Sequence, residues 1–287
     1  LLKNADTAMY KAKSQGRNRY QFYTDDMTQK ALQRVILETN LRKAISNDEF
    51  EVYYQPQVDA IDEKVVSMEA LIRWNNPEKG LISPIHFIPL AEDTGMIIDI
   101  DNWVMQSVMK QVTLWHASKA DIGRVSINIS AILLNYKDFM KHVKESLKTT
   151  KCHPEWLEFE VTESHIMRDT QASIEILNEI SDMGIRISID DFGTGYSSLA
   201  YLKKLPIDKL KIDQSFVKDL TTDENDREIV RTIISMAKNL NMSVIAEGVE
   251  TIEQKEFLVE NGCNTIQGYF YYKPLNVDDI NQNVLKV

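Results

Sequence analysis

Short hydrophobic stretches alternate with segments of helical periodicity along most of the chain. Eight stretches have the length and composition of strands, at 50–58, 65–74, 124–129, 157–162, 185–190, 210–213, 243–247 and 265–267. A segment of helical spacing at 28–47 leads into the first of them, and amphipathic segments separate most of the others, for example at 169–183, 224–240 and 253–261. Repeated strand–helix units predict a parallel sheet in an α/β fold, and eight units are typical of a TIM-like (β/α)8 barrel.

Several of these strands alternate strictly between polar and apolar residues. The segment 157–162 reads Leu-Glu-Phe-Glu-Val-Thr, and 185–190 reads Ile-Arg-Ile-Ser-Ile-Asp. Because side chains on a strand repeat every two residues, each strand has one polar and one apolar face. A half-solvated antiparallel sheet would show the same pattern, but the helices between the strands argue against it. In a barrel the polar faces would point inward and the apolar faces would meet the helices.

Acidic residues gather where these strands end. Glu160, Asp190 with Asp191, Asp213 and Glu247 each come just before a loop. Barrel enzymes of this type place their active sites at the C-terminal ends of the strands. The pattern therefore predicts a site at that end.

So many acids in one place require neutralisation. Two like charges about 4 Å apart repel by roughly 4 kcal/mol at an effective dielectric constant of 20. If Glu69, Asn128, Glu160, Asp190, Asp191 and Glu247 converge, some carboxylates must take up protons or bind cations. An all-oxygen set with one amide suits Mg²⁺, Mn²⁺ or Ca²⁺, and two divalent ions with Lys211 would balance five negative charges. A pair of metal ions is a common device for phosphoryl chemistry.

Amino-acid composition limits the binding partners and the cellular environment that we expect for the chain. The formal net charge of −10 argues against sequence-independent DNA binding, which needs a basic surface. No apolar run reaches the roughly 20 residues of a membrane span, and the N-terminus lacks a signal-peptide pattern, so we expect a soluble segment without membrane contact. Cys152 and Cys263 form no zinc-type spacing and suit free thiols, which favours the cytoplasm. Upstream segments could still anchor a longer protein to a membrane.

The motifs resemble the EAL domain family of cyclic di-GMP phosphodiesterases. Glu69-Ala70-Leu71 carries the family's name, and further blocks follow in the family's order from about residue 28 onward. These are Tyr54-Gln55-Pro56, Asn128-Ile129-Ser130, Glu160-Val161-Thr162-Glu163, the segment 190–199 (DDFGTGYSSL), Lys211-Ile212-Asp213, Glu247-Gly248-Val249-Glu250 and Gln267-Gly268-Tyr269. The resemblance implies the barrel fold in a form whose first strand can be antiparallel.

The resemblance also assigns roles around the metals. Glu69, Asn128, Glu160 and Asp190 would bind one ion, and Asp190 with Asp191 would bind the second. Glu247 would hold the hydrolytic water or the second ion. Lys211 would contact the water as a general base or as an electrostatic anchor. The two ions would be Mg²⁺ or Mn²⁺, whereas Ca²⁺ is expected to inhibit.

Other matching residues would contact substrate or support the site. Gln55, Arg73 and Gln267 are the expected substrate contacts, although Arg73 could instead pair structurally with Glu69 four residues earlier. Glu163 would steady the loop after Asp191, and Glu250 would have a supporting role. Asp213 is expected to orient Lys211, because residues two apart on a strand share a face. The loop at 190–199 is the element expected to couple dimerisation or regulation to the site.

The predicted activity is hydrolysis of cyclic di-GMP to linear 5′-pGpG by a water that two metal ions activate. One alternative is a catalytically inactive cyclic di-GMP receptor. Another is a barrel enzyme that forms an enolate with carboxylate-bound Mg²⁺ and a lysine base, which would leave the amide residues unexplained. We expect a homodimer. Residues 1–23 resemble the end of a GGDEF domain, so residues 24–287 would form the phosphodiesterase domain, preceded in the full protein by GGDEF and sensor domains.

Overall fold

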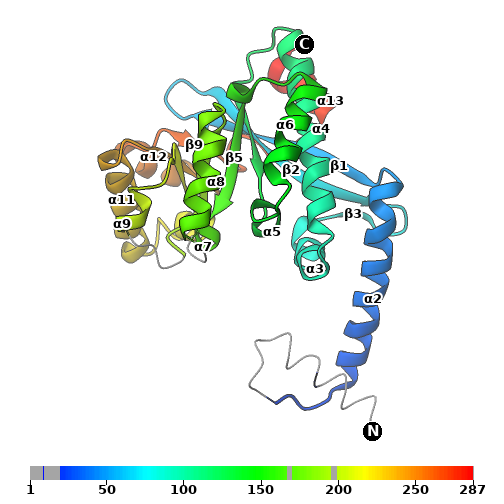
Figure 1. Cartoon of the computed structure of the whole chain (residues 1–287). Coiled ribbons are helices and arrows are strands. Elements are labelled where there is room, and N and C mark those ends of the chain that lie inside the picture. Colours follow the sequence, from blue (N-terminus) through cyan, green and yellow to red (C-terminus); the bar gives the residue numbers. More distant parts are fainter. Residues whose placement is uncertain (1–8, 10–19, 167–169, 195–198, 287) are drawn as a thin grey trace. The chain divides into compact units, whose positions relative to one another are not determined.

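The computed structural model describes residue 9 and residues 20–166, 170–194 and 199–286. The chain divides into two compact units. The first comprises residues up to Glu51 together with Arg73–Ile97, and the second comprises Val52–Ile72 and Ile98–Val287. Strands β1 (Phe50–Asp59) and β2 (Lys64–Asn76) begin or end in the first unit and contribute most of their length to the second. Figure 1 shows the elements of both.

The first unit is built around one long helix and a short strand pair. Helix α2 (Asp25–Ser46) leads into β1, and β3 (Gly80–Ile82) pairs antiparallel with the end of β2. A 3₁₀ turn, η1 (Pro84–His86), and helix α3 (Ile88–Thr94) complete it. Phe50, Trp74 and Phe87 contact one another, with ring centroids 5.7–6.3 Å apart, and form its aromatic core. Strand β3 was not expected from the sequence.

The second unit is a closed eight-stranded barrel. Besides β1 and β2 it contains β4 (Arg124–Asn128), β5 (Leu157–Thr162), β6 (Arg186–Phe192), β7 (Lys209–Ile212), β8 (Ser243–Ala246) and β9 (Thr265–Ile266). The ring runs β1-β9-β8-β7-β6-β5-β4-β2 and closes because β1 also pairs with β2. Strand β1 is antiparallel to β9, whereas each pair from β2–β4 to β8–β9 is parallel. The predicted TIM-like barrel with an antiparallel first strand is confirmed.

Helices follow the barrel strands and cover their apolar faces. They are α4 (Ile97–Ala117), α5 (Ala131–Leu134), α6 (Phe139–Thr150), α7 (Glu163–Ile166), α8 (Thr170–Asp182), α9 (Leu199–Leu202), α10 (Gln214–Lys218), α11 (Glu224–Asn239), α12 (Ile252–Glu260) and α13 (Val277–Asp279), with 3₁₀ turn η2 (Pro154–Trp156) and π-helix η3 (Ile280–Leu285). Residues such as Ile127, Phe159, Ile187 and Leu210 are fully buried, as the alternation predicted.

Side-chain caps fix where several helices begin. Thr251 and Gln254 form a capping box that starts α12, and the Asp223 side chain accepts a hydrogen bond from the Asn225 amide at the start of α11. Within the described residues, none of the helices combines the length and hydrophobicity needed to cross a membrane.

Gly123 brings β4 into very close contact with β2. Its φ is +62°, and a Cβ at this position would lie 1.9 Å from the carbonyl oxygen of Val66. That carbonyl is backbone, so the clash could be relieved only by moving a strand. Gly262 has a similar φ of +89° but no atom within 4 Å of where a Cβ would lie.

We therefore predict that Gly123→Ala destabilises the barrel more than Gly262→Ala does. A left-handed alanine alone costs about 1 to 2 kcal/mol, and overpacking typically adds about 1 to 3 kcal/mol. Urea unfolding of both variants measures the difference. Equal losses in the free energy of unfolding would contradict this close strand approach.

Candidate active site

The ammonium group of Lys211 lies among four carboxylates at the C-terminal ends of the barrel strands. Its Nζ is 3.7 Å from Glu69 Oε1, 3.1 Å from Asp190 Oδ1 and 2.6 Å from Glu247 Oε1, and it donates a hydrogen bond to Glu160 Oε2. The side chains of Lys211 and Glu160 are almost wholly buried, whereas Asp190 and Glu247 are 15% and 18% exposed. Charged groups predicted on β2, β5, β6, β7 and after β8 therefore do converge.

Two amide side chains donate hydrogen bonds to the carboxylate of Glu69. Asn128 Nδ2 donates to Glu69 Oε1 at 2.8 Å, and Gln267 Nε2 donates to Glu69 Oε2 at 2.5 Å. Gln267 also donates to Gln55 Oε1 at 3.1 Å, and Gln55 Nε2 in turn donates to the Tyr272 carbonyl at 3.0 Å. Gln55 and Gln267, the expected substrate contacts, thus lie directly beside an expected metal ligand.

Two residues of this network were missed in the sequence. Gln57 Nε2 donates to Gln267 Oε1 at 2.9 Å, and Ser67 donates to Gln57 Oε1 at 2.6 Å, so both fix the orientation of Gln267. Gln57 is fully buried although polar. Its position two residues after Gln55 on one strand, and hence on the same face, was the available signal.

Burial and mutual repulsion shift the pKa values of these groups. Burial alone would lower the pKa of Lys211, but Asp190, Glu160, Glu247 and Glu69 together raise it well above its usual value. Burial raises the pKa of Glu160 well above its usual range, and raises that of Glu247 to about 8, despite the attraction of Lys211. The four carboxylates around Lys211 therefore outnumber the single ammonium group that could neutralise them.

Asp190 and Asp191 lie where the pairing of β6 with β7 shifts register, between Ile189 and Phe192. Asp191 has a φ of +53°, and its amide donates to Asp190 Oδ1 at 3.0 Å. Burial, Asp190 and Asp213 raise the pKa of Asp191 to about 6. Such irregularities are common beside active sites, where they redirect side chains.

The supporting residues have distinct positions. Glu163 begins α7, and its Oε2 accepts a hydrogen bond from the Gly193 amide at 3.0 Å, which ties down the start of the loop after Asp191. Residues 195–198 of that loop lie outside the described residues. Glu250 is exposed, and its backbone amide donates to Gln254 Oε1 at 2.7 Å.

The expectation for Asp213 needs correction. Strand β7 ends at Ile212, and Asp213 is the N-cap of α10, where it accepts from the amide and hydroxyl groups of Ser215. It also lies against Asp191. The polar–apolar alternation predicted a strand that ends one residue too late. The four carboxylates around Lys211, rather than Asp213, therefore orient its ammonium group. Arg73 is half-buried in the first-unit part of β2.

The predicted ligands do not form a ready metal site. Among the described residues, no three His, Cys, Asp or Glu side chains are arranged to hold a metal ion, because the acids surround Lys211 instead. The donor set nevertheless fits hard divalent cations. Four carboxylates surround a single ammonium group, and Glu160 Oε1 is buried without a hydrogen-bond partner.

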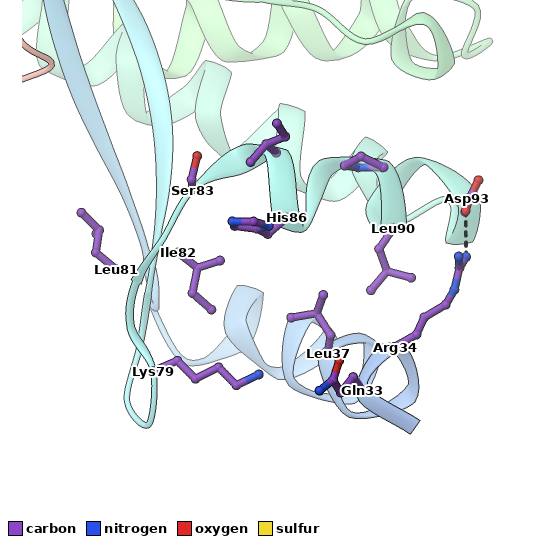
Figure 2. A pocket seen from close by; sticks show the side chains of 12 residues that line it. Gln33, Arg34, Leu37, Lys79, Leu81, Ile82, Ser83, His86, Leu90 and Asp93 are labelled. Atoms are coloured by element: carbon purple, nitrogen blue, oxygen red, sulfur yellow. Dashed lines mark hydrogen bonds and ion pairs between the residues drawn. The ribbon is translucent and has the colours of Figure 1, made fainter. Parts of the chain in front are cut away.

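A separate hollow of about 680 Å³ lies within the first unit (Figure 2). It is bordered by α2, β3, η1 and α3, and an ion pair of 2.7 Å joins Arg34 to Asp93 at one side. None of the residues with candidate chemistry lines it. The C-terminal end of the barrel is therefore the candidate active site.

A (β/α)8 barrel with a cluster of charged residues at the C-terminal strand ends has the architecture of a barrel enzyme. The family model for the EAL domain matches residues 38–274, and the chain belongs to this family.

Two similar proteins match this chain in sequence over nearly its whole length. A protein of Pseudomonas aeruginosa named bifunctional diguanylate cyclase/cyclic di-GMP phosphodiesterase MucR is 42% identical over 98% of this chain, and the Escherichia coli cyclic di-GMP phosphodiesterase PdeR is 39% identical over 96%. The chain spans 41% of the length of each of these two relatives.

A solved structure described as PaMucR phosphodiesterase in complex with c-di-GMP has a TM-score of 0.83 and 42% identity. The match covers 85% of this chain and 99% of that one. The EAL domain of FimX from Pseudomonas aeruginosa, at 23% identity and a TM-score of 0.76 over 83% of this chain and 96% of that one, shows the same fold.

We predict that Lys211→Met destabilises the metal-free protein by about 3 to 5 kcal/mol at pH 8, because it leaves buried carboxylates without their cation. The loss should shrink as the pH falls from about 8 to about 5. Without the ammonium group the folded-state carboxyl pKa values stay above their unfolded values, so the folded state binds more protons and gains stability as the pH falls.

Urea unfolding in EDTA across this pH range measures the effect, with Lys148→Met on the exposed face of α6 as the control. A loss that does not depend on pH would show that Lys211 acts through packing rather than charge.

Proposed function

We propose that this chain hydrolyses one phosphodiester bond of cyclic di-GMP and releases linear 5′-pGpG. The observation that carries the proposal is the group of four acids around Lys211 at the C-terminal end of the barrel. Relatives of about 40% identity that carry the name cyclic di-GMP phosphodiesterase support it. A structure 42% identical to this chain is described as a complex with c-di-GMP.

Two divalent ions, Mg²⁺ or Mn²⁺, would supply charge neutralisation, water activation and stabilisation of the leaving alkoxide when bound. Glu69, Asn128, Glu160 and Asp190 would hold one ion, and Asp190 with Asp191 the other. Asn128 and Gln267 orient the carboxylate of Glu69 by hydrogen bonds. Lys211 would keep the acids together before the ions bind and stabilise negative charge afterwards.

Glu247 is suited to proton transfer. Its carboxyl pKa of about 8 lies near neutral pH, where a group can both hold and accept a proton, and its Oε1 lies 2.6 Å from Lys211 Nζ. We propose that Glu247 takes the proton of the attacking water, whereas Lys211, whose raised pKa keeps it protonated, acts as an electrostatic anchor. Gln55, Gln267 and Arg73 would contact the dinucleotide.

A catalytically inactive receptor for cyclic di-GMP is the second candidate. It is favoured by the arrangement of the acids around Lys211 rather than in a formed metal site. Binding of the dinucleotide without metal and without product would select it. Homodimerisation, a cytoplasmic location and the upstream GGDEF and sensor domains stay predictions; residues 1–8 and 10–19, on which the GGDEF resemblance rests, lie outside the described part of the chain.

We predict that the chain converts cyclic di-GMP to pGpG with Mg²⁺ or Mn²⁺, and that Glu69→Ala and Lys211→Ala each reduce the rate by at least about 10²- to 10⁴-fold. Glu69→Ala should also weaken Mn²⁺ binding. Chromatography of reaction products and calorimetric Mn²⁺ titration measure these effects.

Glu256→Ala, which removes an exposed carboxylate from α12, is the matched control and should keep the normal rate. Absence of product from the unmodified chain at every metal concentration would refute the proposed activity. A normal rate in either variant would remove that residue from the site.

Calcium should bind to the acids but inhibit turnover. Ca²⁺ accepts looser and larger coordination shells than Mg²⁺, so it positions the water and phosphate less strictly. Adding Ca²⁺ to the Mg²⁺-supported reaction should lower the rate, and excess Mg²⁺ should restore it. Full activity in Ca²⁺ alone would contradict the need for strict coordination.

A further inference from the structure

The barrel contains a second charged cavity at the opposite ends of its strands. Its volume is about 310 Å³, and residues at the start of β4, β5, β6, β7, β8 and β9 contribute to its lining. Three cationic side chains line it: Arg124, Arg186 and Lys209. None of these residues belongs to the candidate active site, which lies at the other ends of the same strands.

The acids in this cavity already have partners. Lys209 Nζ lies 2.8 Å from Glu158 Oε1, and both side chains are buried. Glu155, which is exposed, lies 3.4 Å from His153 Nδ1. Glu158, Asp208 and Glu155 lie close enough to attract Arg124, but none of them forms an ion pair with it.

The two arginines have no such partner. Within the described part of the chain, the guanidinium groups of Arg124 and Arg186 make no hydrogen bond within 3.5 Å and no salt bridge within 4.0 Å, and Arg124 Nε is buried without an acceptor. Burial and the repulsion of Arg186 lower the pKa of Arg124. Buried donors are normally satisfied, and a chain with a net charge of −10 offers many acids that could have been placed here.

The strand order places these arginines around one strand. Arg124 begins β4 and Arg186 begins β6, and β5 with Glu158 runs between them, where Glu158 is in register with Arg186. Guanidinium groups bind phosphate through pairs of parallel hydrogen bonds, and a cavity of this volume can hold a small ligand.

We infer that this cavity binds a small phosphate anion, either inorganic phosphate or the phosphate group of a small metabolite, between Arg124 and Arg186. The ligand would supply the acceptors that Arg124 Nε lacks and would relieve the repulsion between the two arginines. This site is separate from the proposed hydrolysis and does not depend on it.

Thermal unfolding in EDTA, which removes divalent ions from the candidate active site, tests the inference. About 10 mM sodium phosphate should raise the melting temperature by roughly 2 °C or more relative to sodium chloride of equal ionic strength. The double variant Arg124→Gln/Arg186→Gln should lose that shift. Lys148→Gln, which removes one exposed positive charge from α6, should retain it.

The variants also separate ligand binding from a structural role. If the arginines serve a ligand, the double variant without phosphate should melt at or above the temperature of the unmodified chain, because it no longer has two like charges in one cavity. If they only support the fold, it should melt lower, and this result would overturn the inference.

Glycerol 2-phosphate in place of phosphate distinguishes the two sources. Equal shifts would support inorganic phosphate, and a larger shift with the ester would support a phosphorylated metabolite. A shift that is the same in the unmodified chain and in the double variant would reflect general salt stabilisation and would also overturn the inference.

Discussion

The contact between the Lys211 ammonium group and four carboxylates governs the architecture of the candidate site. A lysine that is almost wholly buried is stable in its charged form only with anionic partners, and the carboxylates are stable together only around a cation. Each of the five groups comes from a different part of the barrel: β2, β5, β6, β7 and the residue after β8. Closure of the barrel is what brings them within 4 Å of one nitrogen atom.

A second ion pair, between Lys209 and Glu158, lies inside the barrel nearer to the N-terminal ends of β7 and β5. Lys209 and Lys211 lie two residues apart on β7, and Glu158 and Glu160 lie two residues apart on β5. Lys209 therefore pairs with Glu158, and Lys211 contacts Glu160. The pair of Lys209 and Glu158 is a balanced one. The cluster around Lys211 is not, since four carboxylates surround a single ammonium group. Burial, together with repulsion among the acids, raises the carboxyl pKa values of Glu160, Asp191 and Glu247. The surplus of oxygen ligands suits divalent ions. Catalysis is therefore expected at the C-terminal ends of the strands, where Lys211 lies.

Period-two alternation and strand ends allowed the barrel and the convergence of Glu160, Asp190 and Glu247 to be predicted from the sequence, whereas Glu69 was assigned through the family resemblance. Patterns of this kind report which face a side chain occupies, but not which neighbour it meets. For that reason they missed Gln57 and Ser67, which act through hydrogen bonds across strands, and the three-residue strand β3, which has no periodicity of its own. They also misplaced Asp213, because a residue that ends a strand and one that caps a helix have the same sequence signature.

The central claim is that the acid cluster holds protons that a divalent ion must displace. Calorimetric titration of Mn²⁺ at pH 7, in two buffers with different ionisation enthalpies, counts the protons released on binding. Because burial raises the carboxyl pKa of Glu247 to about 8 and that of Glu160 well above its usual range, the account predicts release of at least about one proton per protein molecule. Tight Mn²⁺ binding with no proton release, or no Mn²⁺ binding at all, would contradict it.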